Sequence, residues 1–336
     1  MDAVSKVVVI GASAGGLKAV TELLSKFSPG SNNIAFFVVL HVAKHSMGEV
    51  IVNHIQRHTS LKCRIPEKGE VIKAGHLYLA PPDHHMIIKG KEIVINNGPH
   101  ENRWRPSIDV LFRSAAVAHN SKVIGIILTG LLDDGTSGMG AIKRSGGICM
   151  VQEPEEAEFG DMPNNVLNNV DVDYRVPLGD MGYILNDLFS KPSGDAVPVP
   201  REVQIEAEIT ERLATHVQDL AQIGEHSLFN CPDCGGGLFK VNDPAVNRYR
   251  CHTGHVYTEK TLLQVQSEHI EETLWVAMRM LEERRNLLLT VSGREKQNGP
   301  SNGEWKDKQV RAEEINVHIE RLKHVLQTIS VNEPND

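Results

Sequence analysis

Long hydrophobic runs, a surplus of basic residues and a disulfide pattern are all missing from this chain of 336 residues. No apolar stretch approaches the roughly 20 residues of a membrane span, so we expect no membrane insertion. The N-terminus lacks the charged-then-apolar layout of a secretory signal, which predicts a cytoplasmic protein. A formal net charge of −8 disfavours a nucleic-acid partner, because binding to phosphates requires a basic surface.

Cysteine is scarce, and the five cysteines form no recognisable disulfide framework. Three of them lie near the C-terminus, as Cys231-Pro-Asp-Cys234 and as Cys251 in the segment Cys-His-Thr-Gly-His255. Two thiolates on one short turn supply two ligands of a zinc ion, and a second pair of ligands completes its tetrahedral shell. The predicted ligands of a structural zinc are Cys231, Cys234, Cys251 and His255, with His252 as the alternative fourth ligand. A redox-active CxxC is the competing interpretation, although it would not need the second cluster.

Residues 1–190 alternate short apolar runs with amphipathic segments. Strands are expected at residues 7–10, 35–40, 77–80, 123–128 and 148–151. Helices are expected at residues 17–27, 49–58, 107–118, 139–145 and 164–169. Continuous apolar strands separated by helices predict an α/β fold, with a doubly wound, mostly parallel sheet covered on both faces. A β-hairpin at residues 85–95 is expected as an insertion.

The rest of the chain is expected to form three further segments. Pro, Gly and Ser are enriched after residue 190 and acidic residues follow, so residues 191–228 are predicted to be a linker and an acidic segment. The cysteine pairs predict a zinc ribbon over residues 229–257. Two apolar seams in residues 258–330 predict an antiparallel helical hairpin rather than an oligomer, because each seam can cover the other. The seam residues are Ile270, Leu274, Ala277, Leu281, Leu288 and Val291, then Ala312, Ile315, Ile319, Leu322, Leu326 and Ile329.

The small-residue turn Gly11-Ala12-Ser13-Ala14-Gly15 follows directly on the first apolar run. A serine at such a strand-to-helix turn lies above the sheet edge, close to the free N–H groups of the helix start. That position suits the nucleophile of an acyl-transfer enzyme, but the same local geometry also suits a phosphate-binding turn. The turn alone therefore leaves both functions open.

Two further strand ends offer a base and an acid for Ser13. His41 follows the second apolar run, and Asp133 and Asp134 follow the run at residues 123–128. Because successive parallel strands end at the same sheet edge, these side chains are expected to meet there. A serine nucleophile needs a base for its proton and a third group that orients the base. One aspartate is expected to orient His41 while the other caps the following helix.

Several sequence blocks resemble the catalytic domain of CheB chemoreceptor glutamate methylesterases. The blocks occur in the family's order and cover residues 6 to about 190. They are VVVIGASAGG (7–16), the strand ending in His41, GHLYLAPPDHHM (75–86), NRWRPSIDVLF (102–112), ILTGLLDDGTSGM (127–139) and VQEPEEAEFGDMP (151–163). The resemblance implies that residues 1–190 form a catalytic domain with a Ser-His-Asp triad in that chain order.

Carried over position by position, the resemblance implies that Ser13 is the nucleophile, His41 the base and Asp134 the acid. The backbone N–H groups of Ala14 and Leu131 would stabilise the oxyanion. The implied reaction is the hydrolysis of glutamate methyl esters on a methyl-accepting chemoreceptor or similar methylated protein. Deamidation of receptor glutamines would use the same acyl-enzyme, and neither reaction calls for a catalytic cofactor.

Two departures from the family pattern affect the expectations. Response-regulator relatives carry a phosphorylatable receiver domain before the esterase, whereas the blocks here begin at residue 6, so we expect a receiver-less form. Two-domain relatives usually have Met-Gly where this chain has Leu131-Leu132. Glycine adopts backbone angles that Leu132 adopts only at a cost, which puts the geometry of the oxyanion hole in question.

Arg103, Arg105 and Asp109 are the candidates for substrate binding, since arginines could meet an acidic receptor surface. In the alternative interpretation, Arg105 and Asp109 position a loop through local ion pairs.

Three functions remain in competition. The first is an active methylesterase in chemotaxis signal transduction. The second is a catalytically weak or inactive CheB-like binding module that recognises a receptor or a chemotaxis methyltransferase, and docking to a partner is the expected role of the zinc ribbon. The third is zinc-dependent nucleic-acid binding, which the acidic segments around the ribbon disfavour.

Overall fold

The computed structural model describes residues 4–26, 33–213, 216–297 and 303–331. By their contacts, these residues group into two compact units, Met1–Leu262 and Leu263–Asp336. The first unit holds the sheet and the cysteine-rich segment, and the second holds most of two long helices.

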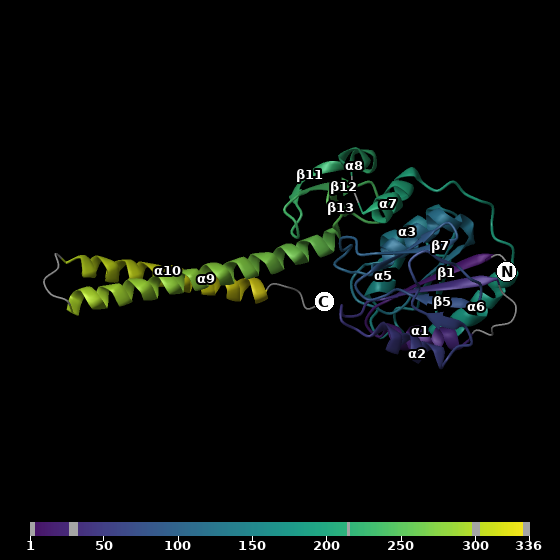
Figure 1. The fold of residues 1–336 in the computed structure, drawn as a ribbon, viewed down its shortest axis with the longest axis horizontal. Coiled ribbons are helices and arrows are strands. Elements are labelled where there is room, and N and C mark those ends of the chain that lie inside the picture. The colour runs from purple at the N-terminus through teal and green to yellow at the C-terminus, as the bar shows by residue number, and fades with distance from the viewer. Residues whose placement is uncertain (1–3, 27–32, 214–215, 298–302, 332–336) are drawn as a thin grey trace. The chain divides into compact units, whose positions relative to one another are not determined.

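A seven-stranded sheet forms the centre of the first unit (Figure 1). Its order is β10–β9–β8–β1–β2–β5–β3, and every neighbouring pair is parallel. The strands are β1 (Lys6–Ala12), β2 (Ile34–Leu40), β3 (Lys62–Arg64), β5 (His76–Leu79), β8 (Val123–Ile127), β9 (Ile148–Gln152) and β10 (Tyr174–Val176). Because β1 lies between β8 and β2, the carboxyl ends of these three strands are neighbours at the point where the strand order reverses.

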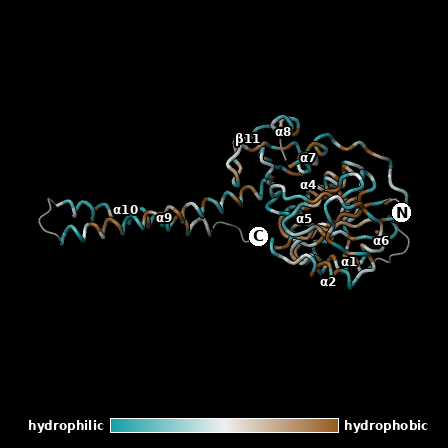
Figure 2. Tube along the Cα trace, in the orientation of Figure 1, coloured by the Kyte–Doolittle hydropathy of each residue, from teal (hydrophilic) through white to brown (hydrophobic). Residues whose placement is uncertain are grey.

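Helices cover both faces of this sheet. One face is covered by α1 (Gly16–Ser25), α2 (Gly48–Gln56) and α6 (Leu178–Ser190), and the other by α3 (Ile108–His119), α4 (Thr136–Arg144) and α5 (Asp161–Asn169). Since side chains alternate along a strand, Val8 and Ile10 of β1 pack with the first group, and Val7 and Val9 with the second. Figure 2 shows the hydrophobic residues concentrated along these strands, where both faces are covered.

A smaller antiparallel sheet of order β4–β7–β6 is formed by segments that lie on either side of β5 in the chain and before α3. It consists of β4 (Glu70–Val71), β6 (His85–Lys89) and β7 (Glu92–Asn96). Met86, Ile88 and Ile93 share one core with α3, so this sheet extends the layer on that side. The hairpin expected at residues 85–95 is β6 and β7.

The predicted α/β fold is confirmed. All five expected strands and all five expected helices overlap observed elements, although residue 27, the expected end of the first helix, lies outside the described residues. The sequence pattern missed β3, β4 and β10 because two or three residues are too few to show an alternation. It also missed α6, which carries Gly179 and Gly182 among its apolar residues and therefore has a weak helical propensity.

Residues 191–200, the Pro-, Gly- and Ser-rich part of the predicted linker, contain no helix or strand, whereas regular elements occupy the acidic part that follows. The helices α7 (Arg201–Arg212) and α8 (Val217–Ile223) lie there, and α7 packs on α3. The strands β11 (Gly224–Asn230), β12 (Gly237–Val241), β13 (Arg248–Cys251) and β14 (Val256–Thr258) form a separate antiparallel sheet, here called the ribbon. Composition misled the prediction because Glu206, which looks like a solvated acidic residue, is buried and paired.

Charged side chains are buried where the ribbon meets α3 and α7, and we call them the interface ion cluster. Its members are Arg113, Arg248, Arg250, Glu101, Glu206 and Asp243. Arg250 donates to Glu101 at 2.6 Å, and Arg248 donates two hydrogen bonds to Glu206, at 2.6 and 3.0 Å. Three guanidinium groups face three carboxylates, and such pairing is the condition under which buried charge is tolerated. The cluster therefore binds the ribbon to the α/β core.

Acid is expected to destabilise the first unit through this cluster. Burial opposes ionisation of Glu101, but Arg113 and Arg250 outweigh it and lower its pKa to about 2. The pKa of Glu206 is also lowered, by Arg248 and despite burial. Such carboxylates stabilise the fold above their unfolded pKa of about 4.3, and this contribution is lost as the pH falls toward the folded value.

The free energy of unfolding in urea should therefore fall between about pH 4 and pH 2, by up to about 1.4 kcal/mol per pH unit for each carboxylate. Glu101→Gln should remove one of the two contributions. A free energy that stays constant over this range would contradict the assignment of charge to the cluster.

Two long helices, α9 (Glu259–Gln297) and α10 (Glu304–Val331), make up the second unit. They run antiparallel, since Ser292 Oγ donates to the carbonyl of Trp305 at 2.9 Å and Arg285 donates to Asn316 at 2.8 Å. Helix α9 continues to Gln297, six residues beyond Val291, the last residue of its predicted seam.

The seams of α9 and α10 pack on each other around Met278, Ile319 and Leu326. Leu274, Leu281, Ile315 and Leu322 pack against this core, as the spacing predicted. Ile270 was expected in the seam but is 53% exposed. The side chain of Ile329 lies outside the part of the chain that the structure describes. Over the described part of the chain, no helix is both long and apolar enough to cross a membrane.

Candidate active site and metal centre

Ser13 lies on the turn between β1 and α1, at the carboxyl edge of the sheet. Its backbone N–H donates to the carbonyl of Thr129 at 3.0 Å, and its own carbonyl accepts from the N–H of Gly16 at 2.8 Å. Gly15 has a φ of 72°, which glycine adopts without strain. A Cβ on Gly130 would lie 2.8 Å from the Cβ of Ser13, so the β8 loop approaches the turn more closely than a side chain allows. The backbone thus fixes Ser13, and its side chain is partly exposed.

His41 follows β2, the strand next to β1, and its side chain is fully buried. The ring stacks on Trp104, with 4.1 Å between ring centroids and 6° between ring planes. His41 Nε2 lies 2.9 Å from Asp134 Oδ2. Within the described residues, His41 Nδ1 has no hydrogen-bond partner. The ring is therefore held by one nitrogen and by stacking, and the other nitrogen is buried and unpaired within the described residues.

Asp134 follows β8, the other neighbour of β1, and five hydrogen-bond donors converge on its carboxylate. Apart from His41, they are Asn102 Nδ2 at 3.0 Å, Ser107 Oγ at 2.9 Å, and the backbone N–H groups of Ile108 at 2.7 Å and Asp109 at 3.2 Å. Burial opposes ionisation, but these hydrogen bonds and the nearby imidazole lower the pKa of Asp134. The charge of Asp134 is therefore stabilised at the position where it faces His41.

Asp109 lies behind Asp134 and is 1% exposed. Its Oδ1 accepts from the backbone N–H groups of Gly135 at 3.0 Å and Gly138 at 2.6 Å, so Asp109 of α3 caps the start of α4. Asn102 Nδ2 donates to both carboxylates. Burial and the charge of Asp134 raise the pKa of Asp109, so Asp134 holds the negative charge that faces His41.

The expected cap on α4 needs a correction. We predicted that one of two adjacent aspartates, Asp133 or Asp134, caps the following helix, but the helix has no capping side chain from its own flank. The cap comes from Asp109, which is distant in sequence and becomes a neighbour only when α3 packs on α4. No local pattern could have revealed it.

Ser13 and His41 line the same cleft, which has a volume of about 680 Å³ and runs between α1 and α2. Its other lining residues include Lys18, His54 and His58. The structure thus brings all three predicted triad residues to one sheet edge: Asp134 bonds to His41, and His41 shares an open cleft with Ser13. This arrangement suits acyl transfer to a substrate that enters along the cleft.

Ala14 follows Ser13 in the chain, and Leu131 follows Gly130, which lies against Ser13, so both are candidate oxyanion donors. Across the described residues, neither backbone N–H donates a hydrogen bond to the protein, so both are available to a ligand. The next residue, Leu132, has a φ of 65°. The backbone thus keeps the left-handed conformation that glycine would favour, and Leu132 bears a strain of about 1–2 kcal/mol.

Leu132→Gly should therefore leave the turnover number within about twofold of wild type, because the backbone already adopts a conformation that suits glycine. Turnover on the same substrate, measured side by side, checks this expectation. A large gain in turnover would instead mean that Leu132 distorts the oxyanion hole.

The three candidates for substrate binding are placed very differently. Arg105 donates to Asp83 at 2.6 and 3.0 Å and to the carbonyl of Gly98 at 2.9 Å, so it holds a loop. Asp109 is in the interior, which does not fit the expectation that it contacts a substrate. Arg103 is exposed and remains a candidate.

Sequence reasoning missed three residues around the triad: Asn102, Trp104 and Ser107. Asn102 and Ser107 donate to Asp134, and Trp104 stacks on His41. All three lie in the block at residues 102–112, so the resemblance could have drawn attention to them. Their contacts, however, span 27 to 63 positions in sequence, as between Ser107 and Asp134, and depend on the fold.

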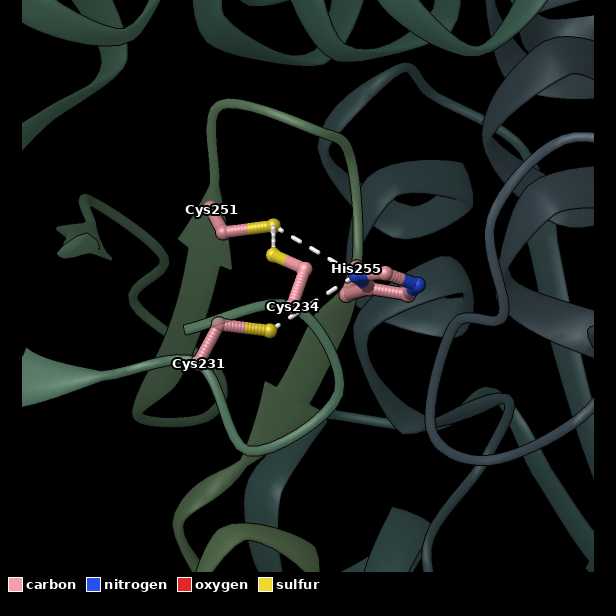
Figure 3. A group of neighbouring side chains, drawn as sticks. All are labelled: Cys231, Cys234, Cys251 and His255. Carbon is pink, nitrogen blue, oxygen red and sulfur yellow. Dashed lines mark hydrogen bonds between the residues drawn. The ribbon is translucent and has the colours of Figure 1, made fainter. Parts of the chain in front are cut away.

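The candidate metal centre lies in the ribbon, where Cys231, Cys234, Cys251 and His255 point toward one another (Figure 3). The Sγ atoms of Cys231 and Cys251 each lie 3.6 Å from His255 Nδ1, and the Sγ atoms of Cys234 and Cys251 are 3.7 Å apart. A tetrahedral zinc, with bonds of about 2.3 Å to sulfur and 2.0 Å to nitrogen, holds its ligand atoms about 3.5–3.8 Å apart. These side chains could therefore hold a metal ion of that size.

Two knuckle turns present these ligands. The N–H of Gly235 donates to the carbonyl of Cys231 at 2.8 Å, and Gly235 has a φ of 72°. Among the described residues, the group of side chains that could hold a metal ion includes His255 but not His252, whose ring packs close to Gly236. The remaining cysteines, Cys63 and Cys149, lie in strands of the parallel sheet.

Comparison with known proteins decides the family. The CheB methylesterase family model matches residues 8–185, more than half of the chain. This chain belongs to the CheB methylesterase family. The matched residues contain Ser13, His41 and Asp134, and they end before α7 and the ribbon.

Solved and curated relatives of the CheB domain agree. The crystal structure of the Thermotoga maritima CheB methylesterase catalytic domain is 26% identical with a TM-score of 0.52, covering 56% of this chain and 100% of that one. A Leptospira interrogans protein, provisionally named protein-glutamate methylesterase/protein-glutamine glutaminase, is 38% identical over 51% of this chain and 88% of its own. Proteins of that name from Trichodesmium erythraeum and Geobacter metallireducens are 35% and 36% identical over 52% of this chain. This chain spans only about half the length of those two relatives.

Proposed function

We propose that this CheB-family protein hydrolyses glutamate methyl esters on a chemoreceptor-like protein, with Ser13 as nucleophile, His41 as base and Asp134 as the residue that orients His41. The observation that carries the proposal is the set of contacts that His41 makes. Its Nε2 is bonded to a charged, fully buried carboxylate, while its Nδ1 has no partner in the described residues and Ser13 lines the same cleft. Serine hydrolases activate their nucleophile with a histidine that bonds a carboxylate through one ring nitrogen and takes the serine proton with the other.

In the first half of the reaction, His41 Nδ1 removes the proton of Ser13 as Oγ attacks the ester carbonyl carbon. The N–H groups of Ala14 and Leu131 stabilise the oxyanion, an effect worth about 3–4 kcal/mol per donor in serine hydrolases. The tetrahedral intermediate then collapses, the bond to the methoxy oxygen breaks, and His41 protonates that oxygen to release methanol. Asp134 stabilises the imidazolium throughout.

In the second half, His41 removes a proton from water as it attacks the acyl-enzyme. The bond to Ser13 Oγ breaks, the proton returns to Ser13, and the free glutamate leaves. A receptor glutamine follows the same course with ammonia as the leaving group. His41 therefore acts once as base and once as acid in each half.

The ribbon is proposed to hold a structural zinc through Cys231, Cys234, Cys251 and His255. The fit rests on the ligand distances and on a donor set of three thiols and one imidazole, which zinc prefers. Zinc would supply no step of the reaction. The need for free thiols favours a reducing compartment, so we place the protein in the cytoplasm.

The test is a methanol-release assay with the purified full chain and a methylated chemoreceptor. Release of methanol, with labelling of Ser13 by a fluorophosphonate, supports the proposal. No release from a receptor that another CheB enzyme demethylates would sink it, and would favour a binding module that recognises receptor or methyltransferase.

A further inference from the structure

Residues 101–104 form a short hairpin with a two-residue turn, and this hairpin supplies two contacts of the triad. Glu101 and Trp104 pair antiparallel, through hydrogen bonds of 2.9 and 3.3 Å. The two residues between them, Asn102 and Arg103, have φ values of 51° and 70°. Positive φ at both central residues is typical of a type I′ turn, in which Asn is favoured first and Gly second. Arg103 therefore occupies a position that costs a residue other than glycine about 1–2 kcal/mol.

This hairpin sets the orientation of the catalytic base and its partner. Asn102 is 1% exposed and donates to Asp134, while the ring of Trp104 lies flat against His41. A shift of the hairpin would move both contacts together. Because the hairpin is strained at Arg103, another part of the molecule must hold it.

The ribbon holds it. The N–H of Asn102 donates to the carbonyl of Val256 at 2.8 Å, and the N–H of Val256 donates to the carbonyl of His100 at 3.3 Å. Glu101 of the hairpin thus forms a parallel β-bridge with Val256 of β14. The side chain of Glu101 is buried and accepts from Arg250 of β13 at 2.6 Å.

Val256 and Arg250, which hold the hairpin, are each adjacent in sequence to a ligand of the metal centre. Val256 directly follows His255, and Arg250 directly precedes Cys251. The N–H of Cys251 also donates to the carbonyl of His255 at 3.0 Å, which closes the knuckle between them. The ribbon strands span only residues 224–258, and at that length a hydrophobic core seldom suffices without a metal. Loss of the metal should therefore loosen Val256 and Arg250 first.

We propose that the metal centre positions the catalytic triad. A metal bound by the three cysteines and His255 fixes Val256 and Arg250, and these two residues hold the hairpin 101–104. The hairpin in turn places Asn102 against Asp134 and Trp104 against His41. The effect on turnover rests on the proposed function, whereas the effect on the geometry of His41 does not. Turnover depends steeply on such alignment, since a misplacement of about 1 Å costs about 100-fold. Asn102 and Trp104 are thus positioning residues.

The experiment compares the full chain loaded with Zn²⁺ and the same chain after chelation, and it reads two quantities. Turnover is measured by methanol release. The state of the triad is measured by proton NMR, through the low-field proton shared by His41 and Asp134, assigned by its absence in His41→Ala. Circular dichroism checks that the α/β core stays folded.

Chelation is expected to lower turnover about 10- to 100-fold and to broaden or shift the His41 proton, while most helicity remains. Cys234→Ser should reproduce this loss, whereas Cys63→Ser, a cysteine outside the metal centre, should not. Asn102→Gly keeps the turn conformation but removes the amide, so it should lower turnover even when Zn²⁺ is bound.

A rescue variant tests the role of the strained turn. Arg103→Gly gives the hairpin an Asn-Gly sequence, which adopts this turn without help from the ribbon. After chelation, Arg103→Gly should retain a larger fraction of its own zinc-loaded turnover than wild type does. An equal fractional loss would contradict the route through the hairpin.

The remaining outcomes separate this proposal from the proposed function. An unchanged His41 proton and unchanged turnover after chelation overturn the coupling and leave the esterase standing. A shifted His41 proton in a protein that releases no methanol supports the coupling and overturns the esterase. Unfolding of the whole first unit on chelation overturns the coupling, because the metal would then be a general stabiliser.

Discussion

Ser13→Ala is expected to lower methanol release from a methylated receptor by about 10⁴-fold or more, the loss seen when a serine hydrolase loses its nucleophile. The fold should survive, because Ser13 makes its structural hydrogen bonds through its backbone N–H and carbonyl, which alanine retains. The receptor should still bind, since only one hydroxyl is removed. Turnover, receptor binding and thermal unfolding of both proteins check the three parts of this expectation.

A matched control is Ser190→Ala, which removes an exposed hydroxyl that donates to the carbonyl of Asp187 at the end of α6. Its turnover should stay within about twofold of wild type. If Ser13→Ala kept more than about a tenth of the wild-type rate, the acyl-enzyme mechanism would be wrong.

Asp134→Asn is expected to combine a loss of turnover of about 10⁴-fold with a loss of stability of about 2–4 kcal/mol. Five donors converge on this carboxylate, from His41, Asn102, Ser107 and two backbone N–H groups. An amide in its place must turn its own NH₂ toward some of them, which leaves donors facing donors. It also no longer stabilises the imidazolium of His41. Turnover and urea denaturation measure the two losses separately.

Asp133→Asn provides the neighbouring control. Asp133 is also buried, but its Oδ1 has no partner among the described residues, and burial raises its pKa, so its ionised form is favoured less than that of Asp134. We expect turnover within a few-fold of wild type and a small change in stability. Comparable losses in Asp133→Asn and Asp134→Asn would show that the convergence of donors on Asp134 does not explain its importance.

The positions of the three proposed triad residues could be predicted because strand ends are readable, whereas their roles as nucleophile, base and acid came from the resemblance. Each of Ser13, His41 and Asp134 follows a continuous apolar run, and parallel strands bring such positions to one edge whatever the rest of the chain does. The residues that orient the triad could not be predicted in this way. Asn102 and Trp104 are placed by a turn of two positive-φ residues, and their importance comes from what lies opposite them in space.

The segment after residue 190 shows the opposite limitation. Proline, glycine and serine predicted a linker, and residues 191–200 contain no helix or strand. The acidic residues after it gave no sign that Glu206 is buried against Arg248 from the ribbon. Composition reports the average environment of a residue type, whereas a buried ion pair depends on a single partner supplied by another strand. The ribbon itself was predictable, because metal ligands must recur at short, fixed spacings.

The sequence by itself determined the α/β fold, the small-residue turn at Ser13, the strand ends that carry His41 and Asp134, and the cysteine knuckles. Each of these is recorded in local spacing, through the period of apolar residues or the separation of ligands. Only the tertiary structure decided that Asp109 caps α4, that Leu132 adopts a glycine-like conformation, and that the ribbon packs on the hairpin beside the triad. These features depend on pairs of residues far apart in the chain, and packing of the core is what makes such pairs neighbours.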